Sequence, residues 1–290
     1  MNKSYLTCFL ALILIATGFS QEVLLKGKIT DSNNIALPFV NIGIPKKNTG
    51  TVSNENGEYK LKTPSNILKN DTVVFSYIGY KTINKSIADL KNQKAISIQM
   101  ETEENQLEEV VFETKKFKDK KLGRTSKGLG LMHFNFYTVY EKEIDDRLSK
   151  ELGMNFKLRK NCRLENFNFA ISQNEFKTLK FRINIYSLTN GQPGDLLISD
   201  NIIFDIKNEQ IGWKSIDLNP YNIYLKEELG EFLLTIQWVE SNKSKAQSKF
   251  FSIPASKSPF HKIYYRDKVM DNFESQTGSL SMYLDAKCSN

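Results

Sequence analysis

The chain has 290 residues, of which 40% are hydrophobic and 25% are charged, and its 40 Lys and Arg against 33 Asp and Glu give a formal net charge of +7. This composition excludes fibrous, wholly disordered and multi-span membrane proteins, and the length is typical of about two domains. Because charges of both signs are interspersed along most of the chain, the positive balance favours solubility and predicts no nucleic-acid partner.

The first 20 residues have the pattern of a secretory signal peptide. Lys3 precedes an apolar run from Phe9 to Ala16, which is far shorter than the ~20 residues that a membrane-spanning helix needs. Cys8 lies inside this run, whereas a lipoprotein carries its cysteine at the cleavage point. We therefore predict cleavage after Ser20 and an exported mature chain without a transmembrane span, located in the periplasm or at the outer-membrane or cell surface.

Export decides how the remaining cysteines are interpreted. Cys162 and Cys288 are the two cysteines of the mature chain, and two thiols in an oxidising compartment are more often paired than free. A bridge would close a loop of 288 − 162 = 126 residues. A buried, reduced pair is the alternative. Zinc fits poorly, because His133 and His261 offer no local pair of ligands with the required spacing. We predict the disulfide, no metal and no cofactor.

Residues 21–100 have the periodicity of short strands. Apolar and polar residues alternate over most of the segments, turn clusters separate them, and Ser53–Gly57 reads as a hairpin loop with Gly79 as a bend. Seven such strands predict a small β-sandwich. The expected strands cover 23–30, 37–44, 49–52, 58–61, 72–78, 80–87 and 95–100.

An ordered series of motifs in this region resembles a known family. The series is KGKITDSNNIALPFVNI, NTGTVSNENGEYKL, DTVVFSYIGYKT, AISIQM and LEEVVF, and it covers residues 23–112. It is similar to the carboxypeptidase regulatory-like domain of exported Bacteroidetes proteins. The resemblance implies a seven-stranded, transthyretin- or prealbumin-like sandwich that acts as an accessory module, attached to outer-membrane nutrient transporters or to zinc carboxypeptidases. It implies no catalytic residues.

The rest of the chain departs from both kinds of larger relative. About 180 residues follow the module, too few for the 22-stranded barrel of a TonB-dependent transporter. A zinc carboxypeptidase needs a His-x-x-Glu pair, and neither His133 nor His261 is followed by one. We therefore expect neither a transporter nor this peptidase.

A charged linker is predicted over residues 101–127. Its first half is acidic and its second half is rich in lysine, so it cannot bury much apolar surface. Val110–Phe112 could dock as a strand on the sheet edge of a partner. A solvated connector is the alternative, and we favour it.

Residues 128–290 read mainly as strands again, with half-buried alternation over Cys162–Ser172 and Leu179–Leu188. One helix is expected, over Glu141–Leu152. The run FRINIYSLTNGQPGDLL with its following strands is similar to jelly-roll modules of secreted bacterial proteins, some of which bind carbohydrate. We predict an all-β protein, with an N-terminal seven-stranded transthyretin-like sandwich and a C-terminal jelly-roll-like sandwich.

Aromatic residues of the second domain could form a platform for sugar rings, although packing in the core is the commoner role. Tyr221 and Tyr224 are the best candidates for ligand binding, because they lie beside a loop that contains proline. The full candidate set is Trp213, Tyr221, Tyr224, Trp238, Tyr264 and Tyr265.

No catalytic constellation emerges from the sequence. The two histidines lack the setting of a triad, and neighbouring carboxylates such as Asp145 and Asp146 are more typical of a solvated face than of a glycosidase pair. We predict a non-catalytic accessory or binding protein of the bacterial cell envelope that engages a protein partner through sandwich edges and loops. Carbohydrate binding by the second domain is the alternative, and a hydrolase with an unfamiliar site is a third.

Overall fold

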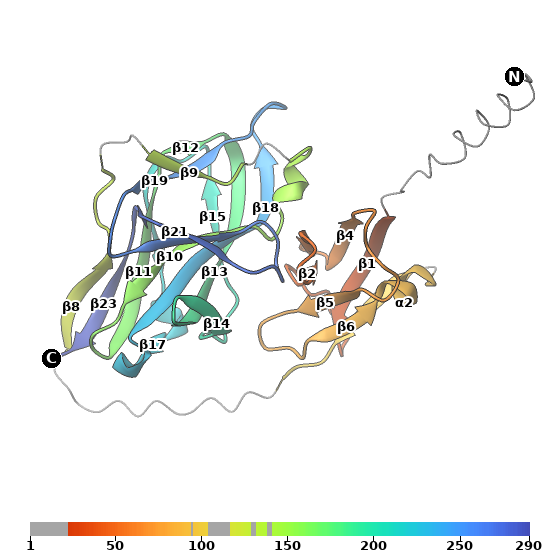
Figure 1. Cartoon of the computed structure of the whole chain (residues 1–290), viewed down its shortest axis with the longest axis horizontal. Helices are drawn as coiled ribbons and strands as arrows, with labels where there is room; N and C mark the ends of the chain where they lie inside the picture. Colours follow the sequence, from red (N-terminus) through yellow and green to blue (C-terminus); the bar gives the residue numbers. More distant parts are fainter. Residues whose placement is uncertain (1–22, 94, 104–116, 129–131, 138–140) are drawn as a thin grey trace, which may run out of the picture.

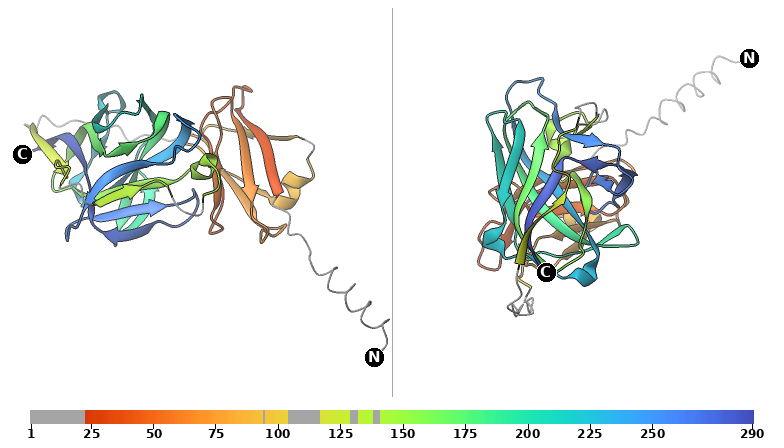
Figure 2. Two further views of the ribbon diagram at one scale, coloured as in Figure 1. Left: turned by 90° about the horizontal axis from the view of Figure 1, so that it is seen from above. Right: turned by 90° about the vertical axis from the view of Figure 1, so that its left-hand side faces the viewer.

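The computed structural model describes residues 23–93, 95–103, 117–128, 132–137 and 141–290. These residues form two β-sandwich units that lie end to end along the long axis of the molecule (Figures 1 and 2). The predicted signal peptide and the predicted docking strand Val110–Phe112 lie outside the described residues. The all-β fold predicted from the sequence is confirmed.

The N-terminal unit contains seven described strands in two sheets. One sheet has the order β4-β1-β7 and the other the order β3-β2-β5-β6. β1 pairs antiparallel with β4 and parallel with β7. The strands are β1 (Val23–Asp31), β2 (Asn41–Ile44), β3 (Thr49–Val52), β4 (Glu58–Thr63), β5 (Thr72–Ser76), β6 (Ile83–Ser86) and β7 (Ile96–Met100).

Alternation of apolar and polar residues places the core of this unit between its sheets. Along β4 the side chains are exposed and buried in strict turn, so Tyr59 and Leu61 face inward. Tyr59 packs edge-on against Phe75 of the opposite sheet, with ring centroids 5.7 Å apart. The predicted strand 80–87 ends earlier than expected, because Ser86 caps a short helix, α2 (Ile87–Lys91), by accepting the N–H of Asp89.

The described part of the C-terminal unit contains three sheets. The large sheet has the order β14-β13-β18-β10-β20-β21, with β15 beside β13. A second has the order β16-β11-β23-β8, with β17 beside β11, and a third has the order β12-β19-β22, with β9 beside β19. The elements are β8 (Phe117–Gly123), β9 (Met132–Asn135), η1 (Ile144–Arg147), β10 (Glu151–Lys157), β11 (Cys162–Ile171), β12 (Gln173–Asn174), β13 (Phe176–Thr189), β14 (Gln192–Leu196), β15 (Ile202–Lys207), β16 (Gly212–Asp217), η2 (Asn219–Tyr221), β17 (Tyr224–Leu225), η3 (Glu227–Leu229), β18 (Glu231–Lys243), β19 (Phe251–Ser256), β20 (Lys262–Arg266), β21 (Glu274–Thr277), β22 (Ser279–Leu280) and β23 (Met282–Ser289).

An aromatic cluster fills the core between the large sheet and the other two. Trp238 of β18 lies within ring-contact distance of Phe136, Phe176, Phe181 and Phe251, all of which are buried. Such rings bury large apolar areas, so this cluster is a main source of stability for the unit.

The predicted helix over Glu141–Leu152 is wrong. The segment contains only the short 3-10 helix η1, and it then turns into β10. The carboxylate of Asp146 accepts the backbone N–H groups of Lys142 and Glu143 and so caps the start of η1. From Glu151 onward the backbone pairs with β18 and β20 instead of with itself.

Part of the predicted linker is a strand of the C-terminal unit. β8 pairs along its whole length with β23, and the ion pair of Lys121 with Asp285 joins the two strands. Its side chains are mostly exposed, so backbone pairing rather than burial of apolar surface holds it. This explains why the hydrophobic pattern does not reveal it.

Cys162 and Cys288 form a disulfide, as predicted. They lie directly opposite each other on β11 and β23, and both are buried. Within the described ranges, no helix has the length and hydrophobicity needed to cross a bilayer.

We expect the double substitution Cys162→Ala/Cys288→Ala to lower the free energy of unfolding by roughly 3 to 5 kcal/mol, because the 126-residue separation of the cysteines makes the closed loop long. Urea denaturation of the oxidised protein, the reduced protein and the variant measures this. A loss of less than about 1 kcal/mol would contradict the assignment of a stabilising role to the bridge.

Candidate functional site: the cleft between the two units

Two glycines allow the units to approach each other closely. Gly43 of β2 lies directly opposite Gly50 of β3. A Cβ atom at Gly43 would lie 2.7 Å from the carbonyl oxygen of Val269, and one at Gly50 would lie 3.2 Å from Ser149 Oγ. Glycine within a strand often marks such an approach of another backbone. The pair thus forms a flat surface on which the segment after β20 rests.

Phe39 provides the apolar part of the contact. It packs with Val52 of its own unit and with Val239 of β18. Its φ of 58° lies in the left-handed region, which costs of order 1–3 kcal/mol for a bulky residue and persists only where the surroundings fix it. Here its N–H donates to the carbonyl of Ser53 (3.0 Å), and its own carbonyl accepts from Arg182.

The guanidinium of Arg182, on β13, lies buried between the units with 1% of the residue exposed. Its Nε donates to Asn201 Oδ1 (2.6 Å) and its Nη1 to Gln237 Oε1 (2.9 Å), both in its own unit. Across the contact, Nη1 donates to Asn41 Oδ1 (3.2 Å) and Nη2 to the carbonyl of Phe39. Burial lowers the pKa of Arg182 to about 10, so it stays charged at neutral pH. Neutral acceptors from both units therefore satisfy this cation.

Tyr77 covers the same site from the N-terminal unit. Its ring lies 5.8 Å from the guanidinium carbon of Arg182, within range of a cation–π contact. Its hydroxyl accepts a hydrogen bond from Asn201 Nδ2 (2.9 Å), and burial raises its pKa. The polar contact between the units thus involves side chains from β2, β13 and β18, together with Tyr77 just after β5 and Asn201 just before β15.

Arg182 is the end of a polar row that crosses the large sheet. Gln237, Glu151 and Arg266 follow it on the neighbouring strands β18, β10 and β20. Glu151 is fully buried and accepts hydrogen bonds from Thr235 Oγ1 (2.8 Å) and Arg266 Nε (3.0 Å). Since buried charges need such partners, this network fixes the outer face of the sheet.

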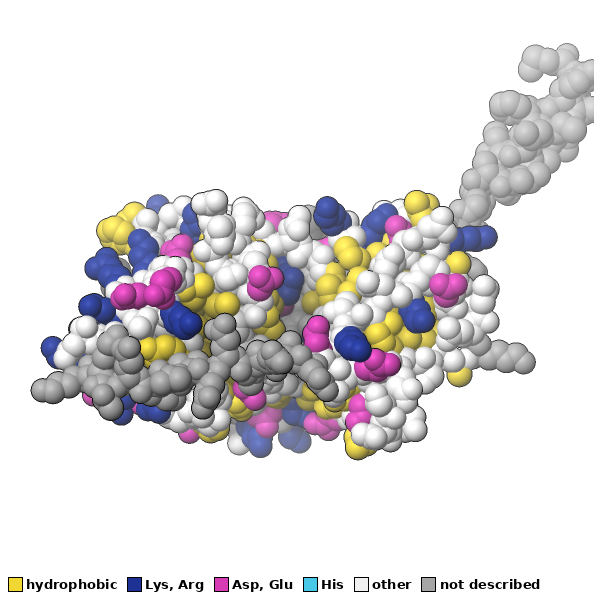
Figure 3. All heavy atoms as spheres, turned by 90° about the horizontal axis from the view of Figure 1, so that it is seen from below, with side chains coloured by type: hydrophobic (Ala, Val, Ile, Leu, Met, Phe, Trp, Pro, Cys, Tyr) yellow, Lys and Arg dark blue, Asp and Glu magenta, His cyan; other side chains and the backbone are white. Residues whose placement is uncertain are grey.

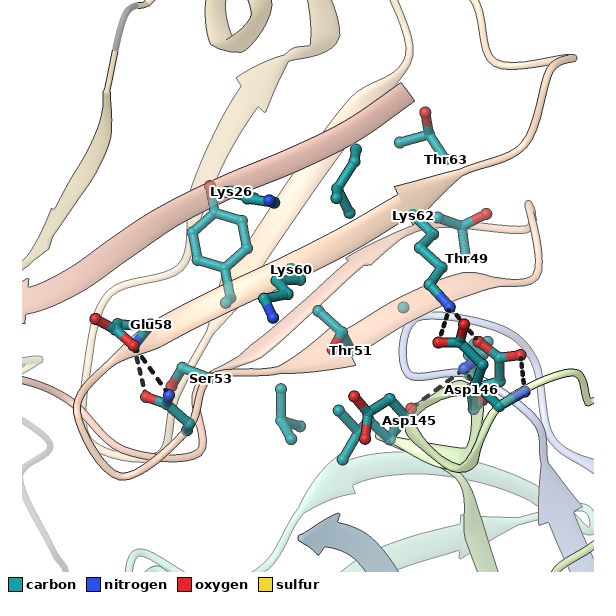
Figure 4. Close-up of a pocket in the computed structure, with 18 of the residues that line it drawn as sticks. Lys26, Thr49, Thr51, Ser53, Glu58, Lys60, Lys62, Thr63, Asp145 and Asp146 are labelled. Atoms are coloured by element: carbon teal, nitrogen blue, oxygen red, sulfur yellow. Dashed lines mark hydrogen bonds and ion pairs between the residues drawn. The ribbon is translucent and has the colours of Figure 1, made fainter. Parts of the chain in front are cut away.

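A cleft of about 1220 Å³ lies beside the contact (Figure 4). One wall consists of β1, β3, β4 and the start of β7, and the other consists of η1, its flanking residues, β18 and the loop after β20. Its walls belong to different units, so the contact described above sets its width. The charged and polar side chains in its lining include Lys26, Lys60, Thr51, Asp145, Glu240 and Asp267.

The charges of the cleft are paired at one end and unpaired along the strand face. Lys62 bridges the units through Glu143 (2.9 Å) and Asp146 (3.1 Å). Burial lowers its pKa, but these hydrogen bonds outweigh that effect, so the pKa is raised. Lys26 and Lys60 lie directly opposite each other on β1 and β4, where like charges destabilise a sheet. Neither forms an ion pair with another residue of the described part.

Lys268 holds the acidic wall in place. Its Nζ donates to the carbonyl oxygens of Asp146 and Leu148, at the end of η1. Burial lowers the pKa of Lys268 to about 8. Together with the bridge from Lys62, this fixes η1 against the N-terminal unit.

The predicted ligand-binding residues lie elsewhere. Tyr221 ends η2 and packs partly against the main core, and Tyr224 lies on β17 opposite Arg163 of β11. Both are half-buried, and neither lines the cleft. Their role in binding stays a prediction.

The six aromatic residues predicted as a platform do not share one surface. Trp238 and Tyr264 are buried, with 0% and 1% exposed, so they belong to packed interiors. Trp213 and Tyr265 are half-buried. Trp213 lies edge-on to Tyr283, which the sequence did not select, with ring centroids 5.2 Å apart. The register of β16, β11 and β23 brings these two rings together, and no local pattern reveals it.

A histidine and a serine approach each other outside the cleft. His133 Nδ1 lies 2.8 Å from Ser172 Oγ. The hydroxyl of Ser172 also lies 3.1 Å from the carbonyl oxygen of Ser252, to which it can donate.

The second histidine contacts the backbone, with His261 Nδ1 3.2 Å from the carbonyl oxygen of Asn155. Among the residues that the structure describes, no three His, Cys, Asp or Glu side chains are grouped so that they could hold a metal ion.

The fold and the cleft define a protein of two joined β-sandwiches. Residues 25–112 match the family described as "CarboxypepD_reg-like domain", and this part of the chain belongs to that domain family. The family predicted from the motifs is confirmed for the N-terminal unit.

The chain is similar to "TonB-dependent receptor P3" of Formosa agariphila, with 33% identity over 110 residues. The aligned stretch covers 38% of this chain and 10% of that receptor, so the chain spans only a small part of the length of this curated relative.

Two solved structures share only weak structural similarity with the chain. One contains the cysteine protease and lectin-like domains of Cwp84, a surface layer associated protein of Clostridium difficile, with 12% identity, a TM-score of 0.39 and coverage of 59% of this chain and 36% of that chain. The other is BcpA, the major pilin subunit of Bacillus cereus, with 11% identity, a TM-score of 0.18 and coverage of 90% and 69%.

We expect Arg182→Met to loosen the contact between the units, because it leaves Phe39, Asn41 and their neighbours without the donor that they share. Removing one partner of a buried charged network costs about 3 to 5 kcal/mol. Calorimetry should then resolve two unfolding transitions.

Arg163→Met is the matched control, because Arg163 lies on β11, away from the contact, and pairs with Glu165. A single transition that shifts no more in Arg182→Met than in this control would contradict the role assigned to Arg182.

Proposed function

We propose that the protein is an exported, non-catalytic accessory protein of the bacterial cell envelope that binds a protein partner. The N-terminal domain family, the similarity of its sequence to part of a TonB-dependent receptor and the disulfide support an extracytoplasmic location. The side of the envelope is part of the proposal, and we favour the periplasm or the outer-membrane surface.

The observation that carries this proposal is the cleft between the two units. It is formed by strand edges and loops, and its lysines include a directly opposed pair that forms no ion pair within the described residues. Figure 3 shows basic and acidic side chains interspersed over the face that it displays. The opposed charges of Lys26 and Lys60 repel each other and so do not stabilise the fold. Acidic groups of a bound partner would neutralise them.

Two carboxylates that line the recess are held in ion pairs. Glu141 is bound to Arg147 (2.6 Å) and Lys150 (3.2 Å), and Glu240 is bound to Lys180 (3.1 Å). Both side chains are thus engaged by cations of their own unit, and we propose that the cleft binds a partner rather than carrying out chemistry.

Affinity purification of the tagged full-length chain from native envelope fractions tests the proposal. We expect one envelope protein to be retained reproducibly at near-equal amounts, and to be lost at high salt, because the exposed lysines would contribute to the contact. Recovery of the protein as a free monomer at low salt, without any retained partner, would contradict it.

A glycan-binding surface is a second candidate, favoured by the half-buried pair Trp213 and Tyr283. Asn168 and Asp285 lie on the same face and are joined by a hydrogen bond of 2.8 Å, so polar groups accompany the rings. This combination suits sugar recognition.

Affinity electrophoresis in gels that contain polysaccharides tests this candidate. We expect retardation that Trp213→Ala abolishes. Loss in Tyr221→Ala/Tyr224→Ala instead would place the site at the loop predicted from the sequence, and no retardation of the wild type would remove the candidate.

A further inference from the structure

The strand β4 has an open edge in the cleft. Within the described strands it pairs with β1 alone. The bond from the N–H of Ile29 to the carbonyl of Gly57 (2.8 Å) fixes which residues exchange backbone bonds, and by alternation Tyr59 and Leu61 face β1. Lys60 and Lys62 therefore direct their N–H and C=O groups away from β1, toward the cleft.

The turn before β4 already uses the first outward position. The N–H of Glu58 donates to Asn54 Oδ1 (2.9 Å), and its carbonyl accepts from the N–H of Asn54 (2.8 Å). At the other end, the side chain of Lys62 is tied to Glu143 and Asp146, whereas its backbone groups remain on the edge. The open stretch is thus short and consists of the outward backbone groups of Lys60 and Lys62.

A cluster of positive charge borders this stretch. Lys26 and Lys60 form a non-hydrogen-bonded cross-strand pair, the type in which side chains lie closest. Figure 4 shows both on the strand side of the cleft, with Asp145 and Asp146 on the opposite side. Lys28, also on β1, lies directly opposite Glu58 in the lining, so the surplus of positive charge is confined to Lys26 and Lys60.

We propose that this edge of β4 binds an extended peptide segment of a partner protein as an added strand, with acidic side chains at alternate positions facing Lys26 and Lys60. This inference rests on the proposed function and specifies its ligand. Backbone groups at Lys60 and Lys62 supply the hydrogen bonds of strand addition, and the two lysines select the charge of the peptide. The cleft supplies the space between β4 and η1.

Lysines on edge strands also serve to prevent pairing with other chains. Lys85 on β6, the edge strand of the other sheet, is an example. Lys60 differs from Lys85 because it lies directly opposite a second lysine and lines a recess. Preventing pairing with other chains requires neither of these features.

Fluorescence anisotropy with three labelled heptapeptides and the full chain tests the inference. The first peptide alternates Glu and Val, and the second alternates Lys and Val. The third has the sequence of the first, with methyl groups on the backbone nitrogens that would donate to β4. The variants are Lys26→Glu/Lys60→Glu and Lys26→Gln/Lys60→Gln, with Lys85→Glu/Lys91→Glu as the charge-matched control on the same unit. Thermal unfolding establishes that each variant is folded.

We expect the Glu peptide to bind the wild type, and its affinity to fall about tenfold or more in both cleft variants, because two favourable ion pairs are lost. The control should bind like the wild type, and the Lys peptide and the N-methylated peptide should bind at least about tenfold more weakly.

Three results would overturn the inference: no binding of the Glu peptide, equal binding of the N-methylated peptide, or equal loss in the control. If any of these occurs while the wild-type chain still retains an envelope protein, the proposed function stands and only the strand-addition site is wrong. If no envelope protein is retained either, both fail.

Discussion

The geometry of the molecule depends on one buried cation. The guanidinium of Arg182 joins neutral acceptors of both units, and it does so under a patch where Gly43 and Gly50 remove the side chains that would keep the units apart. A planar group with several donors can satisfy acceptors from several directions, which a lysine cannot. Without it, the carbonyl of Phe39 and the amide of Asn41 would lose donors in a region closed to water, a cost that favours separation.

The contact between the units defines the cleft. Its strand wall comes from the N-terminal unit and its acidic wall from the C-terminal unit, and the bridge of Lys62 to Glu143 and Asp146 closes one end. Exposed ion pairs of this kind are individually weak, so they make only a small contribution to the width of the cleft, which the buried contact already sets. The pair of Lys26 and Lys60 is then held in a fixed recess, where its charge can act on a ligand.

The strand pattern of the sequence predicts much of the fold but not what covers each face. The alternation over β13 separates Phe181, Ile183 and Ile185 from Arg182 and Asn184, and the structure keeps that division. Arg182 on the polar side nevertheless lies buried, because the N-terminal unit covers it, and periodicity alone cannot show this. The pairing register of strands far apart in the sequence cannot be predicted from local patterns either. This register places Lys26 opposite Lys60 and Trp213 beside Tyr283.

The helix expected over Glu141–Leu152 does not form, because pairing of β10 with two strands outweighs a weak local preference for helix. Tyr221 and Tyr224 were chosen from a local loop signal, whereas the cleft is assembled from residues more than 200 positions apart, such as Lys26 and Asp267.

Residual dipolar couplings of backbone amides in the weakly aligned full-length protein test the central claim most directly, because they report the relative orientation of the units in solution. A fixed contact through Arg182 predicts that one alignment tensor fits the couplings of both sandwiches, in the arrangement of Figure 1. Two tensors of different magnitude or orientation would mean that the units move independently, and the cleft as described would not exist as a defined site.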